Sequence, residues 1–515
     1  MNQLVDARAQ SRSTHPFLIW EPFDGRTEIW SYAKFASDTK RIAAGLAKRG
    51  IRVGDKVLLH FENCPETVLA WYACARLGAI ALTTNARSAA PELAYFADNS
   101  GAVAAITQPK FAELVASACK SLRWIAVTDH DAGEAPKTAG VSCSDSFAAL
   151  YAHESDCPVL AVDPMRDISI QYTSGTTSRP KGVVWTHANA LWGFRVNALH
   201  TDLRADDIHL VQLPLFHTNA QAYSLGASLY AGASCVIMPK FSASRFWDVS
   251  MKHRCTWASM ITFFERALSA SGERVPAHHY RLWGNAISEP PSDAKFGVRT
   301  MGWWGMTETM THGIVADAHH ANRSMMIGKA APEYGVTILK DDGTLSEPGE
   351  VGHLRILGIP GLSLFKEYLN NAGATSDAYD EDGWFITGDR VILHADGFIQ
   401  FSDRDKDMLK VGGENVAASE IERVIYTVTG VQEVAVIGKQ DPIRQEVPVA
   451  FVVCKSGTSR LPVEMESDIL STCEQQLADF KVPRAVHFLE DFPRSVLQKI
   501  AKAKLREQLE AGLFS

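Results

Sequence analysis

The sequence lacks the cysteine patterns that mark disulfide-rich or zinc-binding proteins. It contains no Cys-x-x-Cys pair, and its nine cysteines are scattered between Cys64 and Cys473. An odd number of dispersed cysteines predicts neither a disulfide framework nor a zinc cluster. We expect most of them to be small buried side chains in a reducing compartment.

Membrane and export signals are also missing. No apolar run reaches the length that a bilayer-spanning helix needs. The first residues, MNQLVDARAQSRSTHPF, contain no apolar core of a signal peptide. The sequence therefore predicts a cytoplasmic protein without a membrane span.

An excess of positive charge is absent as well. The 51 basic residues are outnumbered by 59 acidic ones, which gives a net charge of −8. Nucleic-acid-binding proteins usually concentrate basic residues on one face, so this balance argues against a nucleic-acid partner. What remains is ordinary for a globular enzyme, with 46% hydrophobic and 21% charged residues.

The chain alternates between short apolar runs and amphipathic segments. Between residues 56 and 129 the runs KVLLHF, AIALTTN, AVAAITQ and RWIAVTD are separated by helical patterns, and DISIQYT, IHLVQLP and SCVIMP follow within residues 167–300. Such alternation predicts βαβ units and a mostly parallel sheet. The polar stretch at residues 131–146 is expected to be an exposed connection.

The character changes after Gly328, where short strands alternate with glycine- and proline-rich turns. The charged, then glycine-rich stretch FSDRDKDMLKVGGENV predicts a domain junction, since 515 residues exceed one compact core. We predict an α/β fold with a large N-terminal domain, residues 1–404, of βα-layered sheets plus a β-rich subdomain. Residues 405–515 would form a small α+β C-terminal domain.

The strongest local signal is YTSGTTSRPKG, Tyr172–Gly182, directly after an apolar run. Its hydroxyls, its backbone N–H groups and Lys181 could surround a polyphosphate. It is not a Walker A loop, because Pro180 stands where that motif needs glycine. The alternative interpretation is a Gly/Ser/Thr surface turn, which explains the composition but not so many donors beside a lysine.

This segment resembles the [ST]SGTTGxPKG loop of the acyl-adenylate-forming superfamily. That superfamily contains acyl-CoA synthetases, peptide-synthetase adenylation domains and beetle luciferases. The chain carries Ser178 where the superfamily usually has glycine. The resemblance implies that the loop residues bind ATP, namely Thr173, Ser174, Gly175, Thr176, Thr177 and Lys181.

Two further segments resemble the nucleotide site of the superfamily. WGMTET is similar to its YGxTE segment, which implies a phosphate contact and a catalytic role for Thr307, and Mg²⁺ binding and a catalytic role for Glu308. Trp304 replaces the usual tyrosine and would stack on adenine. WGNAIS is similar to the strand on the other side of the base, which implies adenine contacts for Gly284, Asn285 and Ala286. For Glu308 the alternative is a solvated carboxylate without a metal, since a lone acidic residue is usually solvated.

The resemblance continues in order along the chain. GWFITGD is similar to GWxxTGD, which assigns Asp389 to the ribose hydroxyls. DRDKDMLKVGGENV is similar to the junction motif. It implies that Arg404 reaches the nucleotide, that Lys406 is the hinge, and that Gly412 and Gly413, with Phe480, contact coenzyme A.

PRSVLQKIAKAKLRE is similar to the PxTxxGKIxR tail of the superfamily, which places the catalytic lysine at Lys499. Gln498 stands where glycine is commonest. The alternative is an amphipathic helix with a solvated lysine face. Five other motifs in the same order favour the catalytic role.

The acyl pocket is less legible. The resemblance places His217 and Trp303 beside the acid, although a packing role is the alternative for His217. We expect a mid-sized acid that is polar, cyclic or aromatic. The passages GIPGLSLFKEYLNN and KVGGENV most resemble bacterial carnitine- or crotonobetaine-CoA ligases.

Together the motifs imply an ATP-dependent carboxylic acid–CoA ligase that uses ATP, Mg²⁺ and CoA. Its mobile C-terminal domain would rotate about Lys406 between adenylation and thioester formation. The sequence leaves open whether the protein forms a homodimer.

One alternative function is that of another enzyme, either an adenylation domain that feeds a separate carrier protein or a luciferase-type oxygenase. A second alternative is a degenerate nucleotide-binding sensor or scaffold, although both Glu308 and Lys499 are present.

Overall fold

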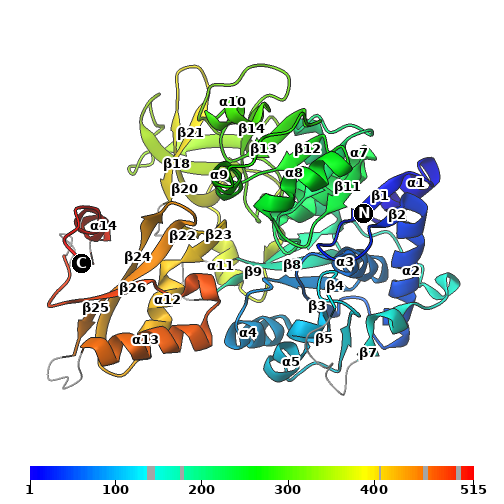
Figure 1. Cartoon of the computed structure of the whole chain (residues 1–515), viewed down its shortest axis with the longest axis horizontal. Coiled ribbons are helices and arrows are strands. Elements are labelled where there is room, and N and C mark those ends of the chain that lie inside the picture. Colours follow the sequence, from blue (N-terminus) through cyan, green and yellow to red (C-terminus); the bar gives the residue numbers. More distant parts are fainter. Residues whose placement is uncertain are drawn as a thin grey trace. The chain divides into compact units, whose positions relative to one another are not determined.

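The computed structural model describes residues 1–135, 145–173, 179–404, 408–455, 462–493, 500 and 502–514. The chain divides into two compact units. Figure 1 labels their helices and strands. The first unit consists of Met1–Ala86, Phe96–Tyr172 and Gly182–Asp403. The second consists of Arg87–Tyr95, Thr173–Lys181 and Arg404–Ser515.

One large sheet of the first unit has the strand order β19-β9-β8-β4-β3-β5-β6-β7. Its strands are β3 (Lys56–His60), β4 (Ile80–Thr84), β5 (Ala102–Thr107), β6 (Trp124–Val127), β7 (Asp145–Ser146), β8 (Asp167–Thr173), β9 (Lys181–Thr186) and β19 (Glu367–Tyr368). β3 pairs in parallel with both β4 and β5, and β4 with β8. This confirms the βαβ pattern predicted for residues 56–129.

A second sheet has the order β16-β15-β14-β13-β12-β10-β11-β1-β2. Its strands are β1 (Pro16–Trp20), β2 (Glu28–Ser31), β10 (Ile208–Val211), β11 (Ser234–Ile237), β12 (Trp257–Ser259), β13 (Leu282–Asn285), β14 (Thr300–Trp304), β15 (Ile314–Val315) and β16 (Lys329–Ala330). The pairs from β1 to β14 are parallel, whereas β2, β15 and β16 join antiparallel at the two edges. The carboxyl ends of β13 and β14 therefore lie at the same edge.

Helices connect and cover these sheets. They are α1 (Asn2–Ser11), α2 (Tyr32–Lys48), α3 (Pro65–Leu77), α4 (Ala90–Ser100), α5 (Pro109–Ala118), α6 (His187–His200), η3 (Asn219–Gly226, a π-helix), α7 (Ala227–Ala231), α8 (Ala243–Lys252), α9 (Thr262–Ala270), α10 (Ser292–Phe296) and α11 (Ala372–Ser376). Short 3₁₀ turns lie at Phe147–Leu150 and Glu154–Asp156. Helix α3 is buried along almost its whole length, as its apolar sequence PETVLAWYACARL requires.

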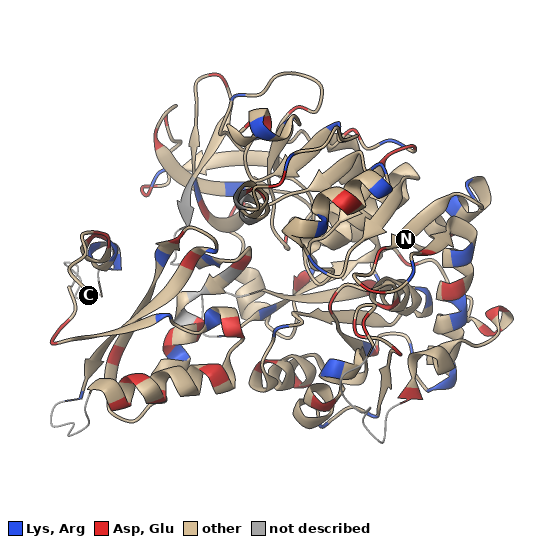
Figure 2. Cartoon of the chain, viewed as in Figure 1, with Lys and Arg blue, Asp and Glu red and all other residues tan. Residues whose placement is uncertain are grey.

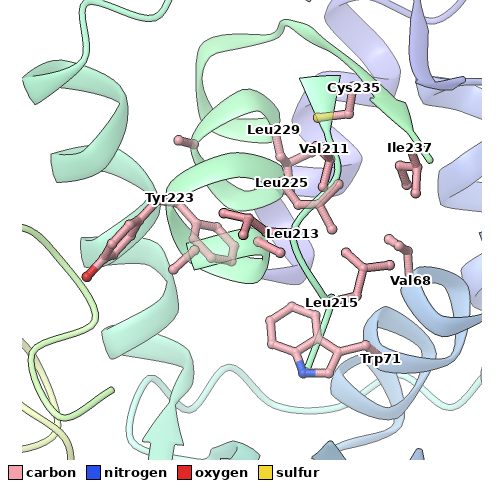
Figure 3. Packing of buried hydrophobic residues seen from close by; sticks show 14 of the residues in the cluster. Val68, Trp71, Val211, Leu213, Leu215, Tyr223, Leu225, Leu229, Cys235 and Ile237 are labelled. Carbon is pink, nitrogen blue, oxygen red and sulfur yellow. The ribbon is translucent and has the colours of Figure 1, made fainter. Parts of the chain in front are cut away.

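The core between the sheets is built from short apolar runs of several elements. Figure 3 shows Val68 and Trp71 of α3 close to Leu215, which follows β10, with Leu225 of η3 nearby. Val211, Cys235 and Ile237 from the parallel strands are buried in the same cluster. Burial of such side chains stabilises the fold by about 1.5–3 kcal/mol each.

A smaller antiparallel sheet follows Gly328. Its order is β17-β18-β20-β21, with β17 at Gly335–Leu339, β18 at Val351–Leu357, β20 at Phe385–Leu393 and β21 at Ile399–Arg404. Burial alternates along β18, so that Leu354 and Ile356 face the core. This confirms the predicted β-rich subdomain.

The main part of the second unit is a sheet with helices on both faces. The strands are β22 (Met408–Val411), β23 (Glu414–Ala417), β24 (Val431–Asp441), β25 (Gln445–Cys454) and β26 (Ala485–Leu489); the helices are α12 (Ala418–Ile425), α13 (Pro462–Gln476), the 3₁₀ turn Asp479–Lys481 and α14 (Lys502–Glu510). Val434 and Val436 of β24 lie in the cluster with α12 and α13, whereas Ala435 and Ile437 lie in the cluster with α14. Period-two alternation thus supplies an apolar face to each layer.

No helix among the described residues is long and apolar enough to cross a membrane. Figure 2 shows basic and acidic residues interspersed along α2. The described cysteines are free, and most of them are buried, as expected. The predicted fold class is confirmed, whereas the division at residue 404 stays a prediction. Most of the polar connection at residues 131–146 lies outside the described residues.

Candidate active site

The first element of the candidate site is the shared edge of β13 and β14. Their register pairs Gly284 with Met301 and Asn285 with Gly302. Because the strands are parallel, the segments that leave them, Ala286 on one side and Trp304–Gly305 on the other, begin at the same edge. The sequence predicted both segments as walls of an adenine pocket, and the fold brings them together. Ligands of open α/β sheets bind at such carboxyl ends.

Trp304 is fixed by Asp389, which comes from β20. The indole Nε1 donates a hydrogen bond of 2.8 Å to Oδ2 of Asp389, and both side chains are buried. The backbone N–H of Asp389 donates to Oγ1 of Thr387. A flat aromatic face beside a carboxylate has the chemistry to hold a base and to accept hydrogen bonds from ribose hydroxyls.

Glu308 follows β14 and is also buried. Its Oε1 accepts a hydrogen bond of 2.8 Å from the phenol of Tyr368. The backbone around it is held at two points, since Phe365 N donates to the carbonyl of Glu308 and Trp185 Nε1 donates to the carbonyl of Thr307. Burial, followed by the neighbouring Glu308 charge, raises the pKa of Tyr368, so the phenol stays a donor.

The Glu308 side chain offers a carboxylate, a ligand type that Mg²⁺ accepts. Within the described residues no cluster of three His, Cys, Asp or Glu side chains could hold a metal ion. Mg²⁺ keeps several waters and is usually bound through one or two carboxylates together with substrate phosphates. The buried carboxylate of Glu308, in the segment that follows β14, is compatible with that pattern.

Asn285, at the end of β13, is held by Glu265 from α9. Asn285 Nδ2 donates to Oε1 of Glu265, and Asn285 Oδ1 accepts from the N–H of Ala286 at 2.7 Å. Ser292 donates to the other oxygen of Glu265 at 2.9 Å. Burial raises the pKa of Glu265, and the hydrogen bonds from Ser292 and Asn285 offset part of that rise. These bonds fix the direction of the strand end.

Trp303 points to the opposite face of β14 and belongs to a buried group of rings. It stacks on Trp257 at 5.8 Å and on His312 at 4.6 Å, and Tyr223 of η3 lies edge-on to it at 5.9 Å. Gly284 lies directly against it, because a Cβ there would come within 1.7 Å of the Trp303 ring. We call Trp257, Trp303, His312 and Tyr223 the ring cluster. The other residue predicted for the acyl pocket, His217, packs against Phe216 at 4.5 Å.

The two ends of the predicted phosphate loop are described. Thr173 is the last residue of β8 and Lys181 the first of β9, which are neighbours in the sheet. The Thr173 hydroxyl donates to the Lys181 carbonyl at 3.5 Å. Ser174, Gly175, Thr176 and Thr177 lie outside the described residues, and so do Lys406, Lys499 and the side chain of Arg404.

The residues predicted to contact CoA lie in the second unit. Gly412 and Gly413 form the turn between β22 and β23, with φ of +59° and +87°. Both angles favour glycine. Phe480 is buried in the core with α12 and α13. Their contacts with CoA stay predictions.

Comparison with known proteins decides the family. The profile of the AMP-binding enzyme matches residues 5–369, and that of the AMP-binding enzyme C-terminal domain matches residues 420–499. The chain belongs to the AMP-binding enzyme family.

Known relatives match nearly the whole length of this chain. A crotonobetaine/carnitine–CoA ligase of Escherichia coli is 35% identical over 522 residues, which cover 98% of each chain. The solved o-succinylbenzoate CoA synthetase of Bacillus subtilis is 24% identical, covers 98% of each chain and superimposes with a TM-score of 0.82. ATP-bound MatB of Rhodopseudomonas palustris is 27% identical, covers 99% of each chain and has a TM-score of 0.68. The predicted class, an AMP-forming acid–CoA ligase, is confirmed.

Sequence reasoning missed two side chains that hold predicted site residues. Tyr368 lies 60 positions after Glu308, and Glu265 lies 20 positions before Asn285. Tyr368 stands in GIPGLSLFKEYLNN, and nothing local in that passage connects it to Glu308. Only strand β19, paired with β9, brings it there.

Proposed function

We propose that this family member activates a mid-sized carboxylic acid as its acyl-adenylate and transfers the acyl group to CoA. In the first step the acid and ATP give acyl-AMP and pyrophosphate. In the second step acyl-AMP and CoA give acyl-CoA and AMP. The observation that supports the proposal is the buried Trp304–Asp389 pair at the edge of β14, which would supply a platform for the base beside an acceptor for the ribose hydroxyls.

The first step needs positioning and charge neutralisation more than covalent chemistry. A carboxylate oxygen of the acid attacks the α-phosphorus of ATP, and the bond to the pyrophosphate oxygen breaks. Trp304 and Asp389 would hold the nucleoside, while Thr173, Lys181 and the loop between them would hold the phosphates. Mg²⁺, held through Glu308, would neutralise phosphate charge. Lys499 would lie beside the developing charge at the acid and the α-phosphate.

The second step places a thiolate against the acyl carbon, and AMP leaves with the electron pair of the broken C–O bond. We propose that the C-terminal domain, residues 405–515, turns about Lys406 between the two steps. Lys499 would then withdraw and Gly412 and Gly413 would approach the pantetheine arm. A cytoplasmic location and a homodimer stay predictions.

We expect the ring cluster to restrict the shape of the acid that binds. Trp303 fills the space beside Gly284 and is held there by Trp257 and His312. His312 is fully buried, and burial followed by the nearby His200 lowers its pKa well below the ordinary value, so its ring is neutral. A wall of neutral rings favours an acid with a compact polar, cyclic or aromatic body. The crotonobetaine/carnitine relative adds those two betaines as the first acids to test.

The experiment that tests this function is a panel of acids assayed for AMP and pyrophosphate release with and without CoA. The panel contains carnitine, crotonobetaine, small cyclic acids, benzoates and a long fatty acid. The expected result is acid-dependent pyrophosphate release together with CoA-dependent AMP release and an acyl-CoA product. AMP release that needs a carrier protein, or oxygen consumption with light, would replace the CoA-ligase proposal with one of the other enzyme classes.

The metal is tested in the same assay. EDTA and Glu308→Gln should each suppress pyrophosphate release, because the amide keeps the size of the side chain and removes its charge. Full activity of the Glu308→Gln enzyme at limiting Mg²⁺ would contradict the assignment of Glu308.

A further inference from the structure

Glu308 and Tyr368 form a buried pair at the candidate site. The Tyr368 hydroxyl donates to Oε1 of Glu308 at 2.8 Å, and the two residues are 7% and 4% exposed. A carboxylate that is buried away from water needs hydrogen-bond donors to stay ionised. Tyr368 supplies one at a defined oxygen.

Tyr368 itself is held from several sides. Its strand, β19, pairs antiparallel with β9, where Tyr368 is opposite Val183. Its backbone N–H donates to Oγ1 of Thr375 at 3.0 Å, and its ring packs against Phe365 at 4.7 Å. The hydroxyl therefore has a fixed position from which to orient the Glu308 side chain.

We propose that Tyr368 is a positioning residue that orients the carboxylate of Glu308 toward the Mg²⁺ of bound Mg·ATP. This inference rests on the proposed function. An ionised carboxylate offers about four lone-pair sites, so Oε1 can accept from Tyr368 while the group still offers lone pairs to a metal. Residues that orient a metal ligand through a hydrogen bond typically change metal affinity by about 10–100-fold when they are lost.

Tyr379 provides a matched control in the same aromatic cluster. Its ring is parallel to that of Phe365 at 6.2 Å, and the Glu308 charge contributes to the raised pKa of its phenol. Its buried hydroxyl has no hydrogen-bond partner within the described residues. Tyr379→Phe therefore removes a hydroxyl near Glu308 without removing a bond to it.

The experiment measures metal binding directly. Mn²⁺ is titrated into the full chain with α,β-methylene-ATP and followed by electron paramagnetic resonance, for wild type, Tyr368→Phe, Tyr379→Phe and Glu308→Gln. Phenylalanine keeps the ring and its packing, and thermal melting checks the fold. We expect Tyr368→Phe to weaken Mn²⁺ binding by about 10–100-fold, and Tyr379→Phe to leave it within about twofold of wild type.

A double variant separates orientation from general structure. If Tyr368 acts through Glu308, Tyr368→Phe should weaken Mn²⁺ binding little further when Glu308 is already Gln. If Tyr368 only supports the fold, the two losses add, and this result would overturn the proposal. Wild-type Mn²⁺ affinity in Tyr368→Phe would overturn it as well.

Two further measurements keep the test decisive. Should Tyr368→Phe fail to fold, Glu308→Asp moves the carboxylate one methylene away from the phenol, and wild-type Mn²⁺ affinity in that variant would contradict the proposal. Acid-dependent pyrophosphate release by wild type is measured separately. If the wild-type enzyme binds Mn²⁺ and the nucleotide analogue but activates no acid, the proposed function fails while the role of Tyr368 is still decided by the titrations.

Discussion

The indole N–H of Trp304 donates to the carboxylate of Asp389 at 2.8 Å, although 85 positions separate the two residues. The bond holds the ring edge against the carboxylate, so the two groups proposed to contact base and ribose orient each other. A hydrogen bond to a charged group contributes about 1.5–3 kcal/mol when it is buried. Trp304, which stands where related sequences usually have tyrosine, thus supplies a donor to the carboxylate that we propose as the ribose acceptor.

The first prediction follows from this pair. Trp304→Phe keeps an aromatic face but removes the N–H, so the KM for ATP should rise by roughly tenfold or more, since about 1.4 kcal/mol corresponds to a factor of ten. Pyrophosphate release at varied ATP measures it. Trp283→Phe is the matched control, because the Trp283 N–H is buried with no hydrogen-bond partner in the described structure. An unchanged KM in Trp304→Phe would show that the bond does not orient the nucleotide site.

The second prediction concerns Lys499, whose role comes from the tail motif. Lys499→Ala should lower adenylation by roughly two to four decades, because it removes a preorganised charge from the transition state. Thioester formation from preformed acyl-adenylate should be largely spared. The two half-reactions are measured by pyrophosphate release and by acyl-CoA formation. Equal losses in both half-reactions would contradict the proposal that the C-terminal domain contributes different residues to each of them.

The third prediction concerns the hinge. Proline fixes φ near about −65° and restricts the preceding residue, so Lys406→Pro should hinder rotation. Adenylation should survive, whereas thioester formation should collapse. Thermal melting separates blocked rotation from unfolding of the C-terminal domain. A folded Lys406→Pro enzyme with normal thioester formation would place the hinge elsewhere.

Gly412 tests the same step through the turn between β22 and β23. Its φ is +59°, and a Cβ there would meet no atom of the described residues within 4 Å. Gly412→Leu should therefore raise the KM for CoA through its added bulk. Gly412→Asn is the control for backbone strain, since asparagine adopts this conformation more readily than other residues. Equal CoA kinetics for Gly412→Leu and wild type would remove Gly412 from the pantetheine path.

The fourth prediction concerns pH and Glu265. Burial raises the pKa of Glu265 above its ordinary value near 4.5, so the folded state binds the proton more tightly than the unfolded state. Stability then falls as pH rises from about 4.5 through the raised pKa. Glu265→Gln should abolish this part of the pH dependence. The melting temperature of the variant should therefore increase relative to that of wild type as pH rises. Parallel melting curves across that window would contradict the assignment.

The fifth prediction concerns the ring cluster. Trp303→Ala removes the ring that packs on Gly284, so the acid profile should move toward bulkier acids while compact acids lose kcat/KM. Truncation of a buried tryptophan costs about 3–5 kcal/mol of stability, so the assay is run well below the melting temperature. The acid panel described above measures the shift. An unchanged profile in a folded variant would show that Trp303 does not limit the acid.

The sequence by itself determined the class of fold and most of the candidate site residues one by one. The alternation of apolar runs and amphipathic segments predicted β3 through β6 because the period of a strand and that of a helix are local properties. The motifs around Trp304, Glu308 and Asp389 could be recognised for the same reason, because each motif is contiguous in the sequence.

Only the tertiary structure decided which of these residues act on one another. Trp304 with Asp389 and Glu308 with Tyr368 are 85 and 60 positions apart, and strand pairing and crossovers bring them together. The sequence also did not predict which face of the sheet the side chains of Trp303 and Trp304 occupy. Trp303 joins the ring cluster and Trp304 meets Asp389, because successive side chains of a strand point to opposite faces and the packing around each face is set by distant segments.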